Sequence, residues 1–252
     1  MPLSPEQIAL FQQDGYLVLP QMVSLEACRQ MLAASAADLR QAVPPLEYEA
    51  ELGYPGAPPS LDATGGKTVR RLRGAWNRAA CFREWAADPE LTAMLRQLLG
   101  EPVCLTLAHH NCIMTKHPDF GSETGWHRDI RYWSFARPDL VSVWLALGDE
   151  NAGNGALKFL PGSHRWQVRR EQMDELDFLR PELEENRRLF GQGVAPSLRQ
   201  GDVVFFHSGL FHAAGRNASP TVKSSVVFAY HGQSNAPLPG TRSAAGGSVA
   251  LD

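Results

Sequence analysis

Hydrophobic and polar positions follow a helical spacing in the first hundred residues and a strand-like spacing in the rest of the chain. Near the start, Ser4 precedes a proline and is followed three residues later by a glutamine, a combination typical of a helix N-terminus. The predicted elements of this front part are a helix from Ser4 that stops at Gly15, a strand over 16–20, a helix from Ser24 through Leu39 and a helix from Asp88 to Leu99.

The second part of the chain consists of short runs rich in Val, Phe, Leu and Thr, separated by Gly, Pro, Asn and Asp. This pattern predicts strands over 102–115, 141–147, 155–160, 194–199, 202–207 and 222–230. A charged stretch with leucines at helical spacing, residues 168–190, interrupts them as an insertion that is helical in part. Helices followed by many short strands predict a mainly β fold with flanking helices, in which a jelly-roll double sheet forms the core.

One domain over residues 1–252 accounts for the length, because a single domain of this size can bury a large core. We expect a mostly helical front over 1–100, a jelly-roll core over 101–232 and a loose tail over 233–252. Residues 43–66 are too rich in Pro and Gly for regular structure, and a segment of this length is expected to be a functional loop or a lid.

The composition of the chain argues against several classes of function. The chain has 24 basic and 27 acidic residues and a formal charge of −3, so no field of one sign attracts nucleic acid or an anionic membrane. The amino terminus lacks the pattern of a secretory signal, no run of apolar residues is long enough to cross a membrane, and we expect a cytoplasmic protein. The four cysteines lie far apart without a C-x-x-C motif and are expected to be reduced.

The segment Gly125–Asp129 carries the clearest chemical signal. In a strand, His127 and Asp129 point to the same face, so an imidazole and a carboxylate can converge on one metal ion. A third ligand must come from a neighbouring strand, and His207 and His212 are both candidates. Two histidines and one carboxylate leave metal positions open, as in non-haem Fe(II) oxygenases. Alone, however, a His-x-Asp pair is also common on solvated surfaces.

Several segments in a fixed order resemble the phytanoyl-CoA dioxygenase family of Fe(II)/2-oxoglutarate-dependent oxygenases. They cover nearly the whole chain: GYLVL at 15–19, WHRD at 126–129, VWLAL at 143–147, NGAL at 154–157, LPGSH at 160–164, and GDVVFF at 201–206 followed by His212 and Asn217. The resemblance implies a double-stranded β-helix fold, and it makes His127, Asp129 and His212 the catalytic iron ligands, whereas His207 falls where the family does not require histidine.

The same resemblance implies that Fe(II), 2-oxoglutarate and O2 act together to hydroxylate a C–H bond of a small organic molecule, such as an acyl-CoA or a secondary metabolite, with succinate and CO2 as co-products. Halogenation is disfavoured, because related halogenases replace the carboxylate ligand that Asp129 provides here. A non-catalytic cupin-like protein that binds metal or ligand is the main alternative. A zinc hydrolase is a third possibility, but no separate general base is evident.

The chain departs from the family at the residue that clamps the far carboxylate of 2-oxoglutarate. The family usually has an arginine eleven residues after the distal histidine, and this chain has Lys223. Lysine keeps the charge but loses the two-pronged geometry. Lys223 as a point charge is the favoured interpretation; help from Arg216 and the use of a different oxo-acid are the alternatives. Asn111 is a further candidate for a hydrogen bond to the oxo-acid.

Aromatic residues around the His-x-Asp pair are candidates for the substrate pocket, in particular Tyr132 and Trp133, although core packing is the commoner use of such residues. A basic run over 67–73 lies beside the Pro/Gly-rich loop and can hold an anionic group of a substrate or form a solvated face. The remaining histidines, His109, His110, His117, His164 and His231, are assigned structural roles.

Overall fold

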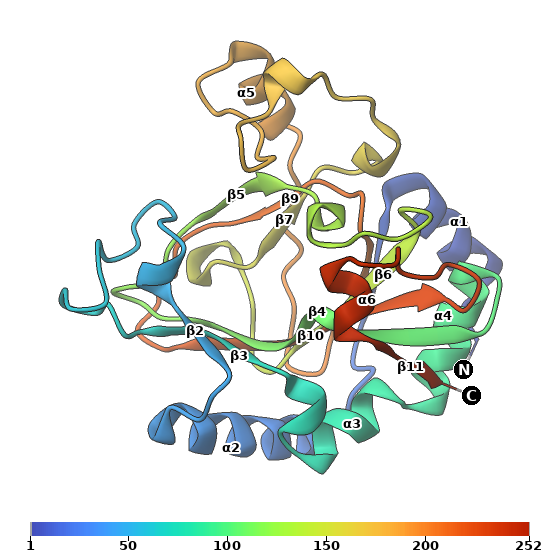
Figure 1. Ribbon diagram of the computed structural model, residues 1–252, viewed down its shortest axis with the longest axis horizontal. Coiled ribbons are helices and arrows are strands. Elements are labelled where there is room, and N and C mark those ends of the chain that lie inside the picture. Colours follow the sequence, from blue (N-terminus) through green and yellow to red (C-terminus); the bar gives the residue numbers. More distant parts are fainter. Residues whose placement is uncertain (1, 252) are drawn as a thin grey trace.

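Two antiparallel β-sheets face each other in the computed structural model, which describes residues 2–251 (Figure 1). The larger sheet has the strand order β1-β8-β6-β10-β4-β3-β2, with β11 added to β4. Its strands are β1 (Tyr16–Leu19), β2 (Leu46–Tyr48), β3 (Val69–Arg73), β4 (Val103–Lys116), β6 (Leu140–Ala146), β8 (Val203–His207), β10 (Lys223–Gly232) and β11 (Ser248–Leu251). The smaller sheet, in the order β5-β9-β7, contains β5 (Thr124–His127), β7 (Leu157–Phe159) and β9 (His212–Ala214).

The helices lie mainly against the outer face of the larger sheet, where α2 and α3 run beneath it in Figure 1. They are α1 (Pro5–Asp14), α2 (Leu25–Gln41), α3 (Ala80–Ala86), α4 (Pro89–Leu99), α5 (Glu184–Phe190) and α6 (Arg242–Gly246). Short 3-10 segments are Glu49–Glu51, Ala75–Asn77, Asp129–Tyr132, Ala152–Asn154, Ser163–Arg165 and Arg170–Gln172. No helix among residues 2–251 is long and apolar enough to span a bilayer.

The helix boundaries follow from the caps read in the sequence. The Ser4 side chain accepts a hydrogen bond from the Gln7 N–H, and Gly15 ends α1 in the left-handed conformation at φ 80°. Ser24 and Asp88 cap α2 and α4 in the same way. These caps confirm the predicted helices of the front part.

Alternation along the strands separates two hydrophobic cores. In β10, Val226 and Phe228 face the helices, whereas Val227 faces the space between the two sheets. The same period of two sends Trp144 of β6 and Phe206 of β8 into the space between the sheets. The predicted jelly-roll core with flanking helices is thereby confirmed.

Some expectations differ from the structure. Residues 194–199 form only isolated bridges, at Val194 and Leu198, and no strand. The Pro/Gly-rich segment 43–66 contains β2 and a 3-10 turn, because its first part pairs with β3. The tail over 233–252 is ordered as far as it is described: α6 packs on β4, and β11 pairs with the same strand. Its small residues gave no periodic signal, so neighbouring structure orders it.

An interruption in β4 prepares the site. Asn111 pairs with Phe228, but the next residue of β10 pairs with Thr106, so residues 107–110 bulge out of the ladder. His110, in this bulge, has φ 46°, a left-handed conformation that a histidine rarely adopts. The bulge turns the His110 side chain toward the space between the sheets, where it lies next to Asp129.

Candidate functional site

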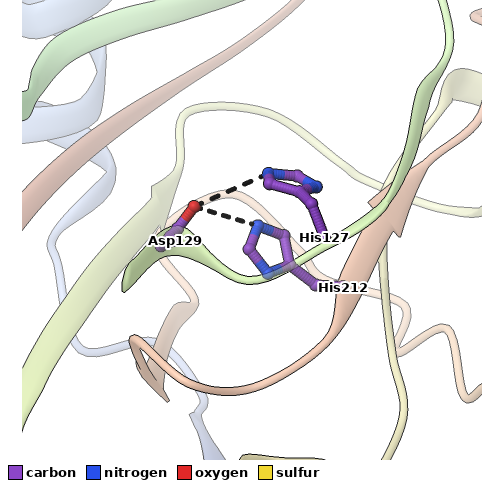
Figure 2. Close-up of side chains that lie close together, drawn as sticks. All are labelled: His127, Asp129 and His212. Carbon is purple, nitrogen blue, oxygen red and sulfur yellow. Dashed lines mark ion pairs between the residues drawn. The ribbon is translucent and has the colours of Figure 1, made fainter. Parts of the chain in front are cut away.

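Three buried side chains, His127, Asp129 and His212, converge between the two sheets (Figure 2). His127 ends β5 and His212 begins β9, and the two residues are direct partners in the antiparallel register. Asp129 lies two residues beyond the end of β5, at the start of a 3-10 turn, and not in the strand as expected. Since Arg128 between them is still extended (φ −114°, ψ 137°), the alternation holds and both side chains share one face.

The ligand atoms of these residues lie within 4.8 Å of one another. Asp129 Oδ1 is 3.6 Å from His127 Nε2 and 3.4 Å from His212 Nε2. The carboxylate of Asp129 is fully buried, and both histidines are at most 5% exposed. The three side chains therefore form a closely spaced set with two nitrogens and one carboxylate oxygen directed to a common point.

Backbone carbonyls orient both imidazoles. His127 Nδ1 lies 2.9 Å from the Gly125 carbonyl oxygen, and His212 Nδ1 lies 3.1 Å from that of Leu210. With the proton on Nδ1, each ring donates to a carbonyl and directs the Nε2 lone pair at Asp129 Oδ1. Metal-binding histidines are held in this way in proteins.

The two carboxylate oxygens of Asp129 differ in their hydrogen-bond partners. Oδ2 accepts a hydrogen bond from Ser142 Oγ at 3.3 Å and lies 3.1 Å from His110 Nδ1. Oδ1 is buried without a hydrogen-bond partner among residues 2–251. A carboxylate oxygen surrounded by two nitrogen lone pairs requires a cation, so these residues fit a divalent metal ion.

The pKa shifts of His127, Asp129 and His212 agree with a site for a divalent metal ion. Burial raises the pKa of Asp129, but the neighbouring His110 and His212 outweigh it and hold the pKa well below its ordinary value. Burial, assisted by His212, keeps the pKa of His127 well below its ordinary value. For His212, burial lowers the pKa, but Asp129 outweighs this and raises it. The carboxylate is thus ionised and competes for a positive charge, which a metal ion supplies.

A narrow cavity of about 60 Å³ extends from the three residues between the sheets. Its apolar walls include Trp144 and Phe206, and its charged lining includes Arg71, Lys116 and Lys223. The two lysines are direct partners across the β4–β10 pair and therefore share the inward face. The candidate metal ligands and the two lysine ammonium groups therefore line the same cavity.

Lys223 belongs to a buried network. Its ammonium donates to Glu150 Oε2 at 3.0 Å and to Ser225 Oγ at 3.2 Å, and it lies 5.0 Å from the centre of the Trp144 ring. Glu150 also accepts from Trp144 Nε1 at 3.0 Å and is 1% exposed. Lys223 therefore points inward as expected, but a carboxylate of the protein itself already pairs with it.

Lys116 is a buried cation that, among residues 2–251, donates side-chain hydrogen bonds to carbonyl groups alone. Its ammonium donates to the carbonyl oxygens of Gly215 at 2.6 Å and Ser122 at 3.1 Å. Burial, followed by the positive charges of Arg70 and Lys223, lowers the pKa of Lys116 to about 7. The sequence analysis missed this residue, although its inward position follows from alternation with Cys112 and Met114 in the same strand.

Two of the other predicted co-substrate residues lie elsewhere. Arg216 does not line the narrow cavity: its guanidinium donates to the Asp119 carbonyl oxygen at 3.0 Å, in a loop. Asn111 lines a different, larger cavity, and its side-chain oxygen accepts from the Trp76 N–H at 2.8 Å. His207, the other candidate for the third metal ligand, is not part of the cluster of His127, Asp129 and His212. Its Nδ1 accepts a hydrogen bond from the Gly209 N–H at 2.9 Å.

The aromatic candidates separate into two environments. Tyr132 lines the larger cavity, and its ring centre lies 6.2 Å from that of His127. Trp133 is 6% exposed and packs behind His110, with ring centres 5.0 Å apart and nearly perpendicular planes. Phe178, in the insertion, packs 5.2 Å from His127 between ring centres. Sequence spacing gave no signal for Phe178, because its contact depends on how the insertion folds back on β5.

The fold and the site define a class: a jelly-roll protein with a buried His-Asp-His set that leaves room for further metal ligands. A family model described as phytanoyl-CoA dioxygenase (PhyH) matches residues 11–225, and the chain belongs to this family. It is therefore an enzyme of the dioxygenase class, which confirms the resemblance and disfavours the cupin-like and zinc-hydrolase alternatives.

Curated relatives agree with this family. The ectoine dioxygenase of Stutzerimonas stutzeri is 26% identical over 93% of this chain and 79% of its own. The peroxisomal phytanoyl-CoA dioxygenase of Rattus norvegicus is 25% identical over 90% of this chain and 68% of its own.

Solved structures share the fold. EctD from S. alaskensis, determined with 2-oxoglutarate and 5-hydroxyectoine, has a TM-score of 0.75 and 24% identity, and the match covers 94% of this chain and 79% of EctD. The non-heme alpha-ketoglutarate-dependent carbocyclase SnoK from nogalamycin biosynthesis has a TM-score of 0.72 and 23% identity, covering 95% of this chain and 88% of SnoK.

Proposed function

We propose that this protein is an Fe(II)/2-oxoglutarate-dependent dioxygenase that hydroxylates a C–H bond of a small organic molecule and forms succinate and CO2. His127, Asp129 and His212 hold the iron. The observation that carries the proposal is the buried Asp129 Oδ1, which has no hydrogen-bond partner among the described residues and faces two imidazole nitrogens. Structures of two similar proteins, EctD with 2-oxoglutarate and SnoN with Fe3+ and alpha-ketoglutarate, support the choice of cofactors.

Bound iron supplies the capacity to activate O2 and to accept the keto-carboxylate end of the oxo-acid as a chelate. The protein contributes fixed geometry. Backbone carbonyls hold both imidazoles in the tautomer that binds metal, and Ser142 and His110 hold the second carboxylate oxygen of Asp129. Apolar side chains, among them Trp144 and Phe206, line part of the narrow cavity in which we place the oxo-acid and would limit the access of water there.

We assign the far carboxylate of 2-oxoglutarate to the paired lysines, Lys223 and Lys116. Lys223 alone replaces the missing arginine poorly, because Glu150 already neutralises it. Lys116 has no carboxylate within ion-pair distance among residues 2–251 and supplies the second N–H donor. With Lys116 protonated, two lysines and one glutamate leave one positive charge, which matches one carboxylate group. Arg216 has no part in this proposal.

The experiment that tests the proposal is conversion of 2-oxoglutarate to succinate by the Fe(II)-loaded protein during long aerobic incubation. The wild type is expected to form succinate only with iron, and Asp129→Ala and His212→Ala to fall to background because each removes a ligand. His207→Ala is the matched control, since it removes a histidine of the same chain segment outside the set. Absence of succinate from the iron-loaded wild type, or its persistence in Asp129→Ala, would refute the assignment.

A further inference from the structure

A second cavity, of about 440 Å³, lies beside the candidate metal centre. It shares Arg71 and His110 with the lining of the narrow cavity, so the two cavities are neighbours. Tyr132 and Leu107 contribute apolar surface to its wall. A volume of this size is within the range of pockets that bind small organic ligands.

The lining of this larger cavity is rich in arginine. Arg71, Arg73 and Arg242 all border it, against Glu47 as the only acidic residue in its lining. Glu47 Oε1 lies 3.4 Å from Arg71 Nε and pairs with that guanidinium. Among residues 2–251, neither Arg73 nor Arg242 has an acidic group within ion-pair distance or a side-chain hydrogen bond. Two solvent-exposed positive charges thus border the cavity with no acidic partner among these residues.

The arginines that give the larger cavity its positive charge come from distant parts of the chain. Arg71 and Arg73 occupy alternate positions in β3, while Arg242 begins α6, which packs on β4. His109 lines the same cavity, and burial, followed by Arg242 and other nearby cations, lowers its pKa to about 4. Arg73 and Arg242 are exposed to solvent, which screens their mutual repulsion, and both line the same cavity, where they can pair with the anionic group of a ligand.

We propose that the larger cavity is the substrate site and that the substrate is an organic anion, whose carboxylate or phosphate group pairs with Arg73 and Arg242. The rest of the molecule packs against Tyr132 and Leu107 and presents its oxidised carbon to the metal past His110. The assignment of the occupant as substrate depends on the function proposed above; the anion site itself depends only on the arginines and the cavity.

Two isosteric fluorinated probes test this inference without turnover. Binding of 4-fluorobenzoate and of neutral 4-fluorobenzamide is followed by 19F NMR on Zn(II)-loaded protein and again on Mn(II)-loaded protein. Both samples contain saturating 2-oxoglutarate, which the proposed function places in the narrow cavity. The variants are Arg73→Gln/Arg242→Gln and, as the matched control, Lys67→Gln, which removes an exposed charge of the same basic run outside the cavity. Phenyl phosphate as a competitor compares phosphate with carboxylate.

We expect the benzoate to bind the wild type at least tenfold more tightly than the benzamide, and to lose about tenfold in the double variant and nothing in Lys67→Gln. Paramagnetic Mn(II) should broaden the signal of the bound benzoate. Equal binding of both probes, or full binding by the double variant, would overturn the anion site, and absence of Mn(II) broadening would overturn its role beside the metal. Failure of the proposed function would appear separately, as absence of succinate while the arginine-dependent binding of benzoate remains.

Discussion

The Glu150 carboxylate competes with 2-oxoglutarate for the Lys223 ammonium and thereby weakens co-substrate binding. The substitution Glu150→Gln removes this competing negative charge. Glu150 is 1% exposed and accepts from Lys223, Ser225 and Trp144. Removal of one partner of a buried ion pair leaves an uncompensated charge and costs about 3–5 kcal/mol. Because the glutamine keeps the shape and one oxygen acceptor, we expect a loss of about 3 kcal/mol, which lowers the melting temperature of the apoprotein by about 6–12 °C for a chain of this size.

The same change should tighten the binding of 2-oxoglutarate. In the wild type, its far carboxylate must share the Lys223 ammonium with Glu150, and two anions about 5 Å apart repel each other by about 3 kcal/mol at an effective dielectric of about 20. Without this repulsion, we expect binding at least about tenfold tighter, equivalent to about 1.4 kcal/mol. The apoprotein therefore loses stability while the complex gains affinity.

Thermal unfolding of the apoprotein and calorimetric titration of 2-oxoglutarate into Zn(II)-loaded protein measure the two effects. Glu26→Gln is the matched control, because it breaks an exposed pair with Arg29 whose side chains are 62% and 63% exposed, and it should change neither quantity appreciably. A double variant, Glu150→Gln with Lys223→Met, should recover stability and lose affinity. Weaker binding in Glu150→Gln with unchanged stability would refute the reasoning.

Three further outcomes follow from the same contacts. Since the pKa of Lys116 is about 7 and only the ammonium binds a carboxylate, affinity for 2-oxoglutarate should fall as pH rises from 6 to 8.5, and calorimetry of Lys116→Gln should show a flatter profile. Ser142→Ala removes a hydrogen bond to Asp129 and should weaken metal binding about tenfold in a competitive chelator titration; unchanged affinity would contradict this role. Arg216→Ala should leave 2-oxoglutarate affinity within twofold of wild type in the same calorimetric assay, because its side chain lies outside the narrow cavity, and a large loss would restore it as a ligand.

Much of the fold was accessible from the sequence because caps and alternation are local signals. Ser4, Ser24 and Asp88 defined three helices correctly, and the long runs around β4, β6, β8 and β10 were found with small boundary errors. The short strands β3, β9 and β11 were not among the predicted strands, because these segments are ordered mainly by the strands with which they pair. β11, for example, exists because it pairs with the first part of β4.

The candidate metal ligands could be predicted, whereas their surroundings could not. His127 and Asp129 were two residues apart, so their convergence required only local extended backbone. Glu150 lies 73 residues before Lys223, and nothing in the sequence connects the two. His110 was assigned a structural role because the resemblance gives it no place in the site. The bulge that directs it to Asp129 depends on an irregular register between β4 and β10, which the sequence does not show. Contacts of this kind are consequences of topology.

The measurement that tests the central claim most directly is anaerobic titration of Fe(II)-loaded protein with 2-oxoglutarate, monitored by the weak visible metal-to-ligand charge-transfer band. The account predicts a saturable band in the wild type, a higher 2-oxoglutarate requirement in Lys223→Ala and Lys116→Ala, and no band in His212→Ala. A wild-type protein that binds iron but gives no band at any concentration of 2-oxoglutarate would contradict the account.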